Sequence, residues 1–335
     1  MSEENPTTQK KDHWFREMML SAGGAWLFLM VSLIIAILIC LLFPLVVQRN
    51  GIVSSLQVVI YISQDQVYAE PLLREFERQT GIDVRAVYDS EAVKTVGLVN
   101  RLIAEKDRPQ CDIYWSNEEM RTRQLAAIGV LEQWAAVGHR SRRIAVNTNQ
   151  VSLAAAPRSL TELTNSRWHG KVALAYPLFG TTAAHFLSLR QRWSDEPWQN
   201  WCRAFAANKP FLVDGNSVSA KLVAKGEAWV GLTDSDDIAA EQREGGSIVP
   251  LPLTEESLLI PNTIAVVRGA RHPEAAEKLY AYLQRSDVLE KLVAAQALEG
   301  VFPSIGPQAT LKPDWDQLLS ELDASITEMK QIFLR

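Results

Sequence analysis

From residue 56 onward, short β-branched runs alternate with segments whose apolar residues recur at helical spacing. The run LQVVIYI (56–62) predicts a buried strand, and Leu72, Leu73 and Phe76 form one apolar face on the segment that follows it. The same order continues with strands predicted over 83–88 and 112–115 and helices predicted over 91–106 and 117–129. A βαβαβα order of this kind implies a parallel sheet with helices on its faces.

A second series of the same kind begins after a strand predicted over 142–148. It comprises strands over 171–176, 211–213, 229–233 and 258–269, helices over 181–193, 198–207, 217–226 and 235–246, and helical segments up to the C-terminus. The two series share one architecture, although the sequence contains no internal repeat. Because 335 residues exceed one ordinary core, we expect an α/β protein with two lobes and an appendage.

The appendage contains an apolar segment, Ala25–Val47, with 23 residues and no charge. A helix of that length rises about 35 Å, which is enough to span a bilayer. A cleaved signal peptide and a lipoprotein modified at Cys40 are the rival interpretations, and neither finds small residues where its cleavage site requires them. We therefore expect a retained transmembrane helix as a single-pass anchor.

The charges around this segment predict its orientation. Lys10, Lys11 and Arg16 precede it, and only Arg49 follows it closely. The positive-inside rule makes residues 1–24 a cytoplasmic tail and places the rest of the chain outside the inner membrane, in the periplasm or the extracellular space. The formal net charge of −5 lies entirely beyond residue 49, which argues against a nucleic-acid partner.

The chain has three cysteines, Cys40, Cys111 and Cys202, and no two of them have CxxC spacing. The sequence therefore indicates neither a zinc site nor a redox motif. Cys111 and Cys202 belong to elements of different lobes. We expect both to be free thiols.

Polar residues follow most of the predicted strands. Ligands of open α/β sheets bind outside the carboxyl ends of strands, so these residues are candidates for a binding site. Each cluster alone also has a structural explanation, because Ser, Thr, Asp and Asn are preferred helix caps. Six clusters together favour a cleft. With Asn262 from the strand predicted over 258–269, the candidates are Ser63, Gln64, Asp65, Asp89, Asn117, Glu118, Gly180, Thr181, Thr182, Asn216, Asp234, Asp236 and Asp237.

Two kinds of subsite are expected among these candidates. At Gly180–Thr182 a glycine allows close approach to the first amides of a helix, and no acid stands in that first turn, which favours an anion. The acidic candidates favour a cation instead, because carboxylate oxygens suit Fe³⁺, divalent hard ions or an ammonium group. The expected metal ligands are Asp65, Glu118, Asp236 and Asp237.

Other polar residues point to no further chemistry. The histidines are scattered without HxxxH or HExxH spacing, and Arg140, Arg142 and Arg143 form a small basic cluster that we expect to be a solvated face. The chain contains no nucleophile elbow, P-loop or metal–histidine motif, so we do not expect an enzyme.

Five stretches, in order, carry a family resemblance: IYISQDQVYAEPLLREFERQTGIDVRAVYDSEAVKTVGLVNRLIAEKDRPQCDIYWSNE, RWHGKVALAYPLFGTTAAH, VGLTDSDD, LLIPNTIAVVRGARHPEAAEKLYAYL and FPS. Over about residues 56–305 the chain resembles the bacterial extracellular solute-binding proteins (family 1) of ABC importers, in the branch that contains ferric-iron-binding proteins. The resemblance implies a two-lobed, type II periplasmic-binding-protein fold. Two doubly wound sheets are then joined by two crossover strands, near 143–148 and 260–266.

The resemblance also implies a division of the chain and a set of partners. Residues 55–146 would form the first part of lobe 1, 147–260 lobe 2, and 261–335 the return to lobe 1 together with the C-terminal helices. Such proteins close on a solute by hinge motion and deliver it to a permease. The implied partners are a small charged solute and an ABC permease, with a monomeric ectodomain.

The metal site of that family is altered in this chain. Asp65 stands at a position where iron binders often carry a histidine. Asn117, followed by Glu118, stands where they use a glutamate. Asp236 and Asp237 stand where they carry paired tyrosines. The anion-holding turn is retained in Gly180–Thr182.

The resemblance thus implies capture of Fe³⁺ or a divalent metal ion with a synergistic anion, although the loss of the tyrosines argues against ferric iron. An aminophosphonate-type zwitterion is the alternative solute. Two other functions compete with solute capture. One is a metal-assisted hydrolase with Asp234 or Asp236 as base, and the other is a ligand sensor.

Overall fold

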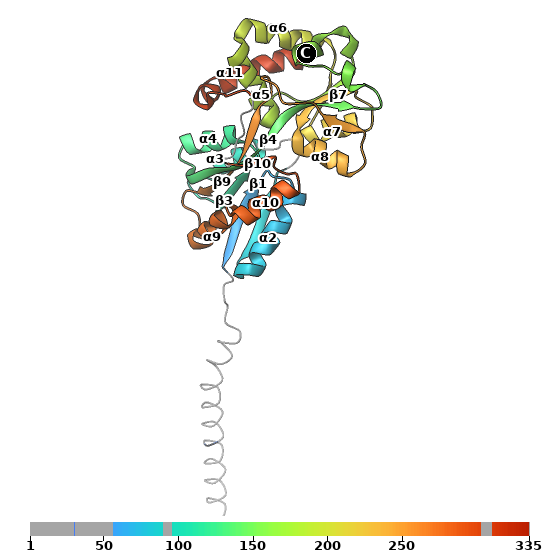
Figure 1. Ribbon diagram of the computed structural model, residues 1–335. Helices are drawn as coiled ribbons and strands as arrows, with labels where there is room; N and C mark the ends of the chain where they lie inside the picture. Colours follow the sequence, from blue (N-terminus) through green and yellow to red (C-terminus); the bar gives the residue numbers. More distant parts are fainter. Residues whose placement is uncertain (1–29, 31–55, 90–95, 303–309, 335) are drawn as a thin grey trace, which may run out of the picture. The chain divides into compact units, whose positions relative to one another are not determined.

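The computed structural model describes residues 30, 56–89, 96–302 and 310–334 of the chain (Figure 1). Residues Leu56–Arg335 form one compact unit, and Met1–Ser55 form another. Within the described ranges, no helix has both the length and the apolar character needed to cross a membrane. The anchor predicted over 25–47 lies outside these ranges except for Met30, and the start of the helix predicted over 91–106 lies outside them too.

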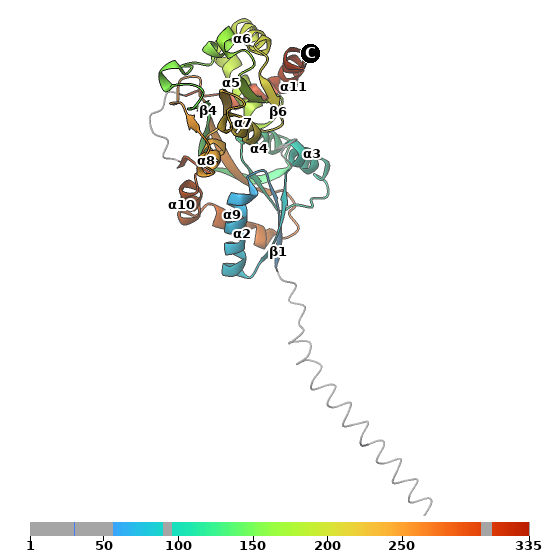
Figure 2. The same cartoon turned by 90° about the vertical axis from the view of Figure 1, so that its right-hand side faces the viewer.

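The first lobe is built on three parallel strands. β1 (Gln57–Ile62) pairs with β2 (Asp83–Tyr88) on one side and β3 (Ile113–Ser116) on the other. Side chains of β1 alternate between two cores, so Ile60 and Ile62 pack on one face and Tyr61 on the other. Helices cover both faces (Figure 2): α2 (Gln66–Thr80), α9 (Pro273–Leu283) and α10 (Ser286–Ala294) on one, α3 (Val96–Ala104) and α4 (Glu119–Ala127) on the other.

The second lobe repeats this arrangement around β5 (Val172–Ala175), which pairs in parallel with β6 (Phe211–Val213) and β7 (Val230–Asp234). The C-terminal helix also packs here, with the ring of Phe333 centred 5.8 Å from that of Phe186. The helices of this lobe are α5 (Gly180–Trp193), α6 (Asp195–Ala207), α7 (Asn216–Ala224), α8 (Ser235–Arg243) and α11 (Trp315–Phe333).

Two long strands run through both lobes. β4 (Leu131–Asn147) pairs antiparallel with β9 (Leu259–Val267) in the first lobe, and with β7 and β8 (Ile248–Pro250) in the second. The strand order β2-β1-β3-β9-β4-β7-β5-β6 makes the sheet mixed rather than purely parallel. β4 is longer than the strand predicted over 142–148, because register shifts near Gln133 and Gly138 interrupt the alternation by which a strand is recognised.

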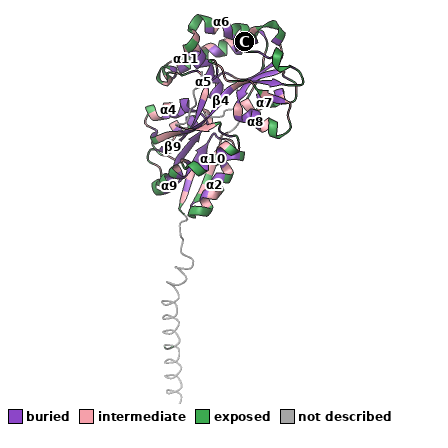
Figure 3. Ribbon diagram, viewed as in Figure 1, coloured by how far each residue is buried: buried purple, intermediate pink, exposed green. Residues whose placement is uncertain are grey.

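Burial follows these layers. The central strands β1, β3, β5, β7 and β9 are buried along most of their length, the edge strands β2 and β6 are only partly covered, and the helices expose their outer faces (Figure 3). Cys111 and Cys202 are free and buried, each in the core of a different lobe. The remaining short elements are η2 (Leu153–Ala155), η3 (Thr161–Thr164), η4 (Ser166–Trp168) and β10 (Gly300–Val301).

Candidate functional site

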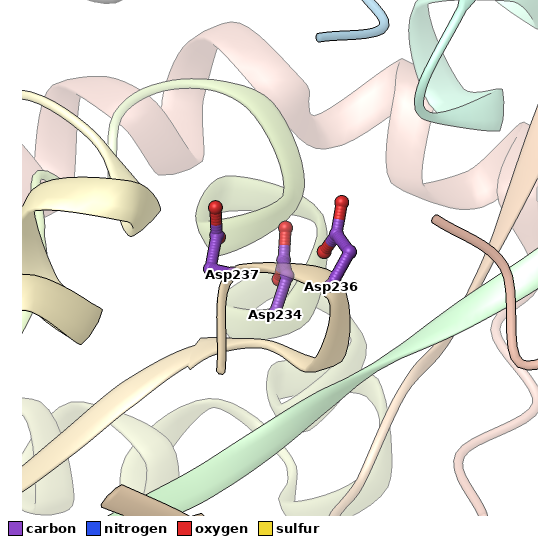
Figure 4. Close-up of side chains that lie close together, drawn as sticks. All are labelled: Asp234, Asp236 and Asp237. Carbon is purple, nitrogen blue, oxygen red and sulfur yellow. The ribbon is translucent and has the colours of Figure 1, made fainter. Parts of the chain in front are cut away.

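Three carboxylates lie together where β7 ends and α8 begins (Figure 4). Asp234 is the last residue of β7, and Asp236 and Asp237 stand in the first turn of α8, where the positive end of the helix dipole favours acids. One oxygen from each side chain lies within 4.8 Å of the others, and all three residues are buried. Taken alone, three converging carboxylates are suited to a cation.

Two buried arginines of β4 reach these carboxylates. Arg140 places Nη1 2.5 Å from Oδ2 of Asp236 and Nη2 3.2 Å from Oδ2 of Asp234. Arg142 stands opposite Asp234 in the β4–β7 register and places Nη1 2.7 Å from its Oδ1. The expectation that the arginine cluster is a solvated face is therefore wrong for Arg140 and Arg142, which are 3% and 1% exposed.

The arginines set the charge states of the two acids. Burial acts to raise the pKa of Asp234, but the charges of Arg140 and Arg142 outweigh it and hold that pKa below its ordinary value. Burial raises the pKa of Asp236 to about 6, because Arg140 offsets it only in part and the charge of Asp234 adds to it. Asp234 is therefore a carboxylate at neutral pH, and Asp236 gains a proton in mild acid.

The N-termini of two helices lie beside these carboxylates. α5 begins at Gly180 and α7 at Asn216, and neither helix has an acid in its first turn or a side-chain cap. Gly180 has φ +52°, a conformation that favours glycine. The first amides of a helix have no partner within it and carry a partial positive charge, so both termini favour an anion.

These elements enclose a cavity of about 50 Å³, named here the cleft cavity. A volume of this size admits a few water-sized groups, and so a small ion or the charged end of a larger solute. Its walls are Asn117, Arg140, Ala175, Tyr176, Phe179, Gly180, Thr181, Thr182, Asp214, Gly215, Asn216, Ser217, Asp234 and Asp237.

The hydroxyls predicted to hold an anion are already donated within the protein. Thr181 Oγ1 donates to Oδ2 of Asp234 at 2.8 Å, and Thr182 Oγ1 donates to Oδ1 of Asn216 at 3.1 Å. Asn216 Nδ2 donates to Thr181 Oγ1 at 2.8 Å, and Arg142 Nη1 donates to Asn216 Oδ1 at 2.7 Å. This closed network fixes the starts of α5 and α7, and it leaves the backbone amides as the groups suited to an anion.

The first-lobe candidates contribute less to the cleft cavity. Asn117 is on its wall, and its carbonyl accepts from Arg140 Nη2 at 3.1 Å. Ser63 Oγ accepts from the amide of Asn117 at 3.3 Å. Asn262 Nδ2 donates to Gln64 Oε1 at 2.8 Å, in a buried pair away from the cavity wall.

Two of the expected metal ligands stand outside the carboxylate cluster. Among the described residues, only Asp234, Asp236 and Asp237 bring one ligand atom each to the same point. Glu118 caps α4, its carboxylate accepts from the amide of Arg121, and burial raises its pKa to about 7. Asp65 precedes α2 and is half-buried.

Asp89 follows β2 and is half-buried as well, and it does not line the cleft cavity.

Sequence reasoning missed the arginines as site residues. Arg140 and Arg142 stand two positions apart in a strand and therefore point to the same side of it. That spacing can be read from the sequence. The pairing of these arginines with β7 cannot be predicted from it, because the pairing depends on contacts between residues 92 or more positions apart.

The chain is similar to known solute-binding proteins. Residues 56–295 match the family described as bacterial extracellular solute-binding protein. The major ferric iron-binding protein of Neisseria gonorrhoeae is 21% identical over 284 residues, which are 76% of this chain and 84% of that protein. The corresponding protein of Neisseria meningitidis serogroup B is also 21% identical, over 285 residues and the same shares.

Solved structures show the same fold. Iron-bound HitA from Pseudomonas aeruginosa superposes with a TM-score of 0.73 at 17% identity, covering 83% of this chain and 99% of HitA. AfuA from Actinobacillus pleuropneumoniae, solved with fructose-6-phosphate, gives a TM-score of 0.67 at 19% identity and covers 83% of this chain and 96% of AfuA. The expected α/β periplasmic-binding-protein architecture is confirmed.

Proposed function

The chain belongs to the bacterial extracellular solute-binding proteins, and from this premise we propose that it captures a small anionic or zwitterionic solute for an ABC importer. Its matched relatives are binding proteins, so this chain is a binding protein and not an enzyme. The solute would lie in the cleft cavity, between Asn117 of the first lobe and the starts of α5 and α7 in the second.

The pairing of the acids with arginines supports this proposal best. Arg140 and Arg142 hold Asp234 and Asp236 in buried ion pairs, so two of the three carboxylates are already neutralised without a metal. The helix starts at Gly180 and Asn216 carry no acid, and they supply partial positive charge to the same cavity. An oxyanion is therefore the group that this cavity favours.

A zwitterion uses the cavity more completely than a simple anion. Its phosphonate or carboxylate end would accept from the amides that begin α5 and α7, and its amine would lie near Asp237, which is on the cavity wall. An aminophosphonate has this pattern of charges.

Capture of a hard metal ion with an anion is the second candidate. It is favoured by the 4.8 Å convergence of Asp234, Asp236 and Asp237, and by the ferric iron-binding relatives. In this candidate Fe³⁺ or a divalent ion would replace the guanidinium of Arg140 as the partner of Asp236. The synergistic anion would then occupy Gly180–Thr182.

Binding measurements on the purified chain distinguish the two candidates. We expect saturable heat of binding with 2-aminoethylphosphonate or inorganic phosphate in calorimetry, weakened by Thr181→Val. The control Thr161→Val, in the exposed η3, should bind as the unaltered chain does. Iron or manganese that co-purifies in stoichiometric amount and is lost in Asp236→Asn would instead establish the metal candidate. Absence of saturable binding with 2-aminoethylphosphonate and phosphate, together with absence of co-purifying iron or manganese, would refute both candidates.

We further propose that residues 25–47 anchor the protein in the inner membrane, with 1–24 in the cytoplasm and the binding lobes in the periplasm. The solute would then pass to an ABC permease in the same membrane. Cross-linking in intact cells should recover a permease. Recovery of a sensor kinase instead would support the ligand-sensor alternative.

A further inference from the structure

Asp214 lies on the wall of the cleft cavity, in the turn that joins β6 to α7. Its side chain is exposed, and no hydrogen bond or ion pair engages its carboxylate within the described part of the chain. Gly215, not Asp214, is the N-cap residue of α7, and no side chain caps this helix. Helix capping, the usual structural role of an aspartate at this place, therefore does not account for Asp214.

Asp214 is close to the amides that would hold an oxyanion. Two steps of the chain separate it from Asn216, the first residue of α7, so their Cα atoms are at most roughly 7 Å apart. Across a partly solvated cavity, a unit charge at about this distance changes the affinity for another charge by about tenfold. The carboxylate of Asp214 therefore opposes an anion at the start of α7, and it favours a cation there.

The charges around the cleft cavity do not balance. Among the described residues, its charged wall residues are three carboxylates and one guanidinium: Asp214, Asp234, Asp237 and Arg140. Asp236 and Arg142, which pair with these residues, add one charge of each sign, so the formal charge at neutral pH is −2. The starts of α5, α7 and α8 each contribute roughly half a positive charge. They offset most of this charge and leave the cavity slightly negative.

A simple oxyanion and a zwitterion meet this balance differently. Either can accept from the amides that begin α5 and α7. A simple oxyanion adds its whole negative charge to a cavity that is already slightly negative. A solute that carries an ammonium group beside its oxyanion adds less, and its cation is attracted to the carboxylates of the wall.

We infer that the cleft cavity selects oxyanions that carry an ammonium group over oxyanions that lack one, and that Asp214 sets this preference. The inference rests on the proposed function, because it concerns the solute of the same cavity. Asp234 is buried and engaged by Arg140 and Arg142, and Asp237 is buried as well. Asp214 is the wall carboxylate that stays exposed to an incoming solute.

Three probes separate the two ends of such a solute. In calorimetry at pH 7.5 on the purified full chain, 2-aminoethylphosphonate should bind about tenfold more tightly than ethylphosphonate, which lacks only the amine. Ethylamine keeps only the cationic end and should not saturate, because it offers no oxyanion to the helix amides. Equal affinity of the two phosphonates, or saturable binding of ethylamine, would overturn the inference.

A matched pair of variants tests the residue. Asp214→Asn removes the charge and keeps the size of an exposed side chain, so the melting temperature should not change. It should weaken 2-aminoethylphosphonate and strengthen ethylphosphonate, until the two affinities agree within about twofold. The control Asp107→Asn removes an exposed acid of the first lobe that does not line the cavity, and it should keep the preference of the unaltered chain.

The outcomes separate this inference from the proposed function. If neither phosphonate saturates, capture of an oxyanion in the cleft cavity is refuted, and the inference is refuted with it. If both saturate and Asp214→Asn keeps the preference of the unaltered chain, the cavity binds oxyanions but Asp214 does not select among them.

Discussion

Replacing Arg140 by methionine tests whether its guanidinium stabilises the buried carboxylates of Asp234 and Asp236. Arg140 and Asp236 are 3% and 1% exposed, and the closest N–O distance between them is 2.5 Å. Removing one partner of a buried ion pair costs about 3–5 kcal/mol, because the other charge is left without compensation. In a unit of roughly 280 residues, Leu56–Arg335, that loss lowers the melting temperature by about 5–8 °C.

The pH dependence of this loss identifies its cause. The pKa of Asp236 is about 6 with Arg140 in place, and it rises further when the guanidinium is removed. Below pH 5 the carboxyl of the variant is neutral and loses little from the missing partner. Above pH 7 it is charged, buried and unpaired, so the destabilisation by Arg140→Met should grow as the pH rises.

Urea unfolding at pH 5 and pH 8 measures the difference. Asp236→Asn in the Arg140→Met background should recover most of the stability at pH 8. Arg192→Met is the control, since its ion pair with Glu255 is exposed and should leave the unfolding midpoint nearly unchanged. An equal loss at both pH values, or no recovery by Asp236→Asn, would refute the reasoning.

Three further changes have defined outcomes. Glu118 has its pKa raised from 4.5 to about 7 by burial, so native stability should fall by roughly 3 kcal/mol as the pH rises from 4.5 to 7, and Glu118→Gln should flatten that slope in urea unfolding. Gly180→Ala forces a side chain into positive φ, so it should cost about 1–2 kcal/mol in thermal unfolding and weaken phosphate binding in the cleft cavity; unchanged affinity would remove Gly180 from the site. Arg243 of α8 donates across the lobes to Tyr68 Oη at 2.5 Å and to the carbonyl of Ala295 at 2.6 Å, so Arg243→Ala should enlarge the scattering radius of the ligand-free chain, whereas an unchanged radius would show that other contacts hold the lobes.

The order of elements was predictable because the evidence for it is local. The short apolar run of β1 and the helical spacing of Leu72, Leu73 and Phe76 each need fewer than ten residues of sequence. The length of β4 was not predictable, since bulges near Gln133 and Gly138 break its alternation. The packing of α11 on the second lobe also escaped prediction, because an amphipathic helix shows that it has an apolar face but not which core receives that face.

The candidate site shows the same limit. Strand ends and helix starts located Gly180, Thr181, Asn216 and Asp234 on one cavity, because parallel strands end at a common edge. Whether those groups hold a cation or an anion depends on their neighbours across the sheet. Arg142 stands opposite Asp234 in the β4–β7 register, and no sequence pattern in either segment predicts that pairing.

The two arginines also decide how a metal ion would have to bind. The N–O distances of 2.5–3.2 Å place each guanidinium roughly 5 Å from any ion held by the same carboxylate oxygens. At an effective dielectric of about 20, Fe³⁺ would be repelled by roughly 10 kcal/mol per guanidinium at that distance. One anion at the starts of α5 and α7 offsets only part of this repulsion. Iron binding would therefore require Arg140 and Arg142 to leave the carboxylates, whereas an oxyanion solute would bind with both ion pairs intact.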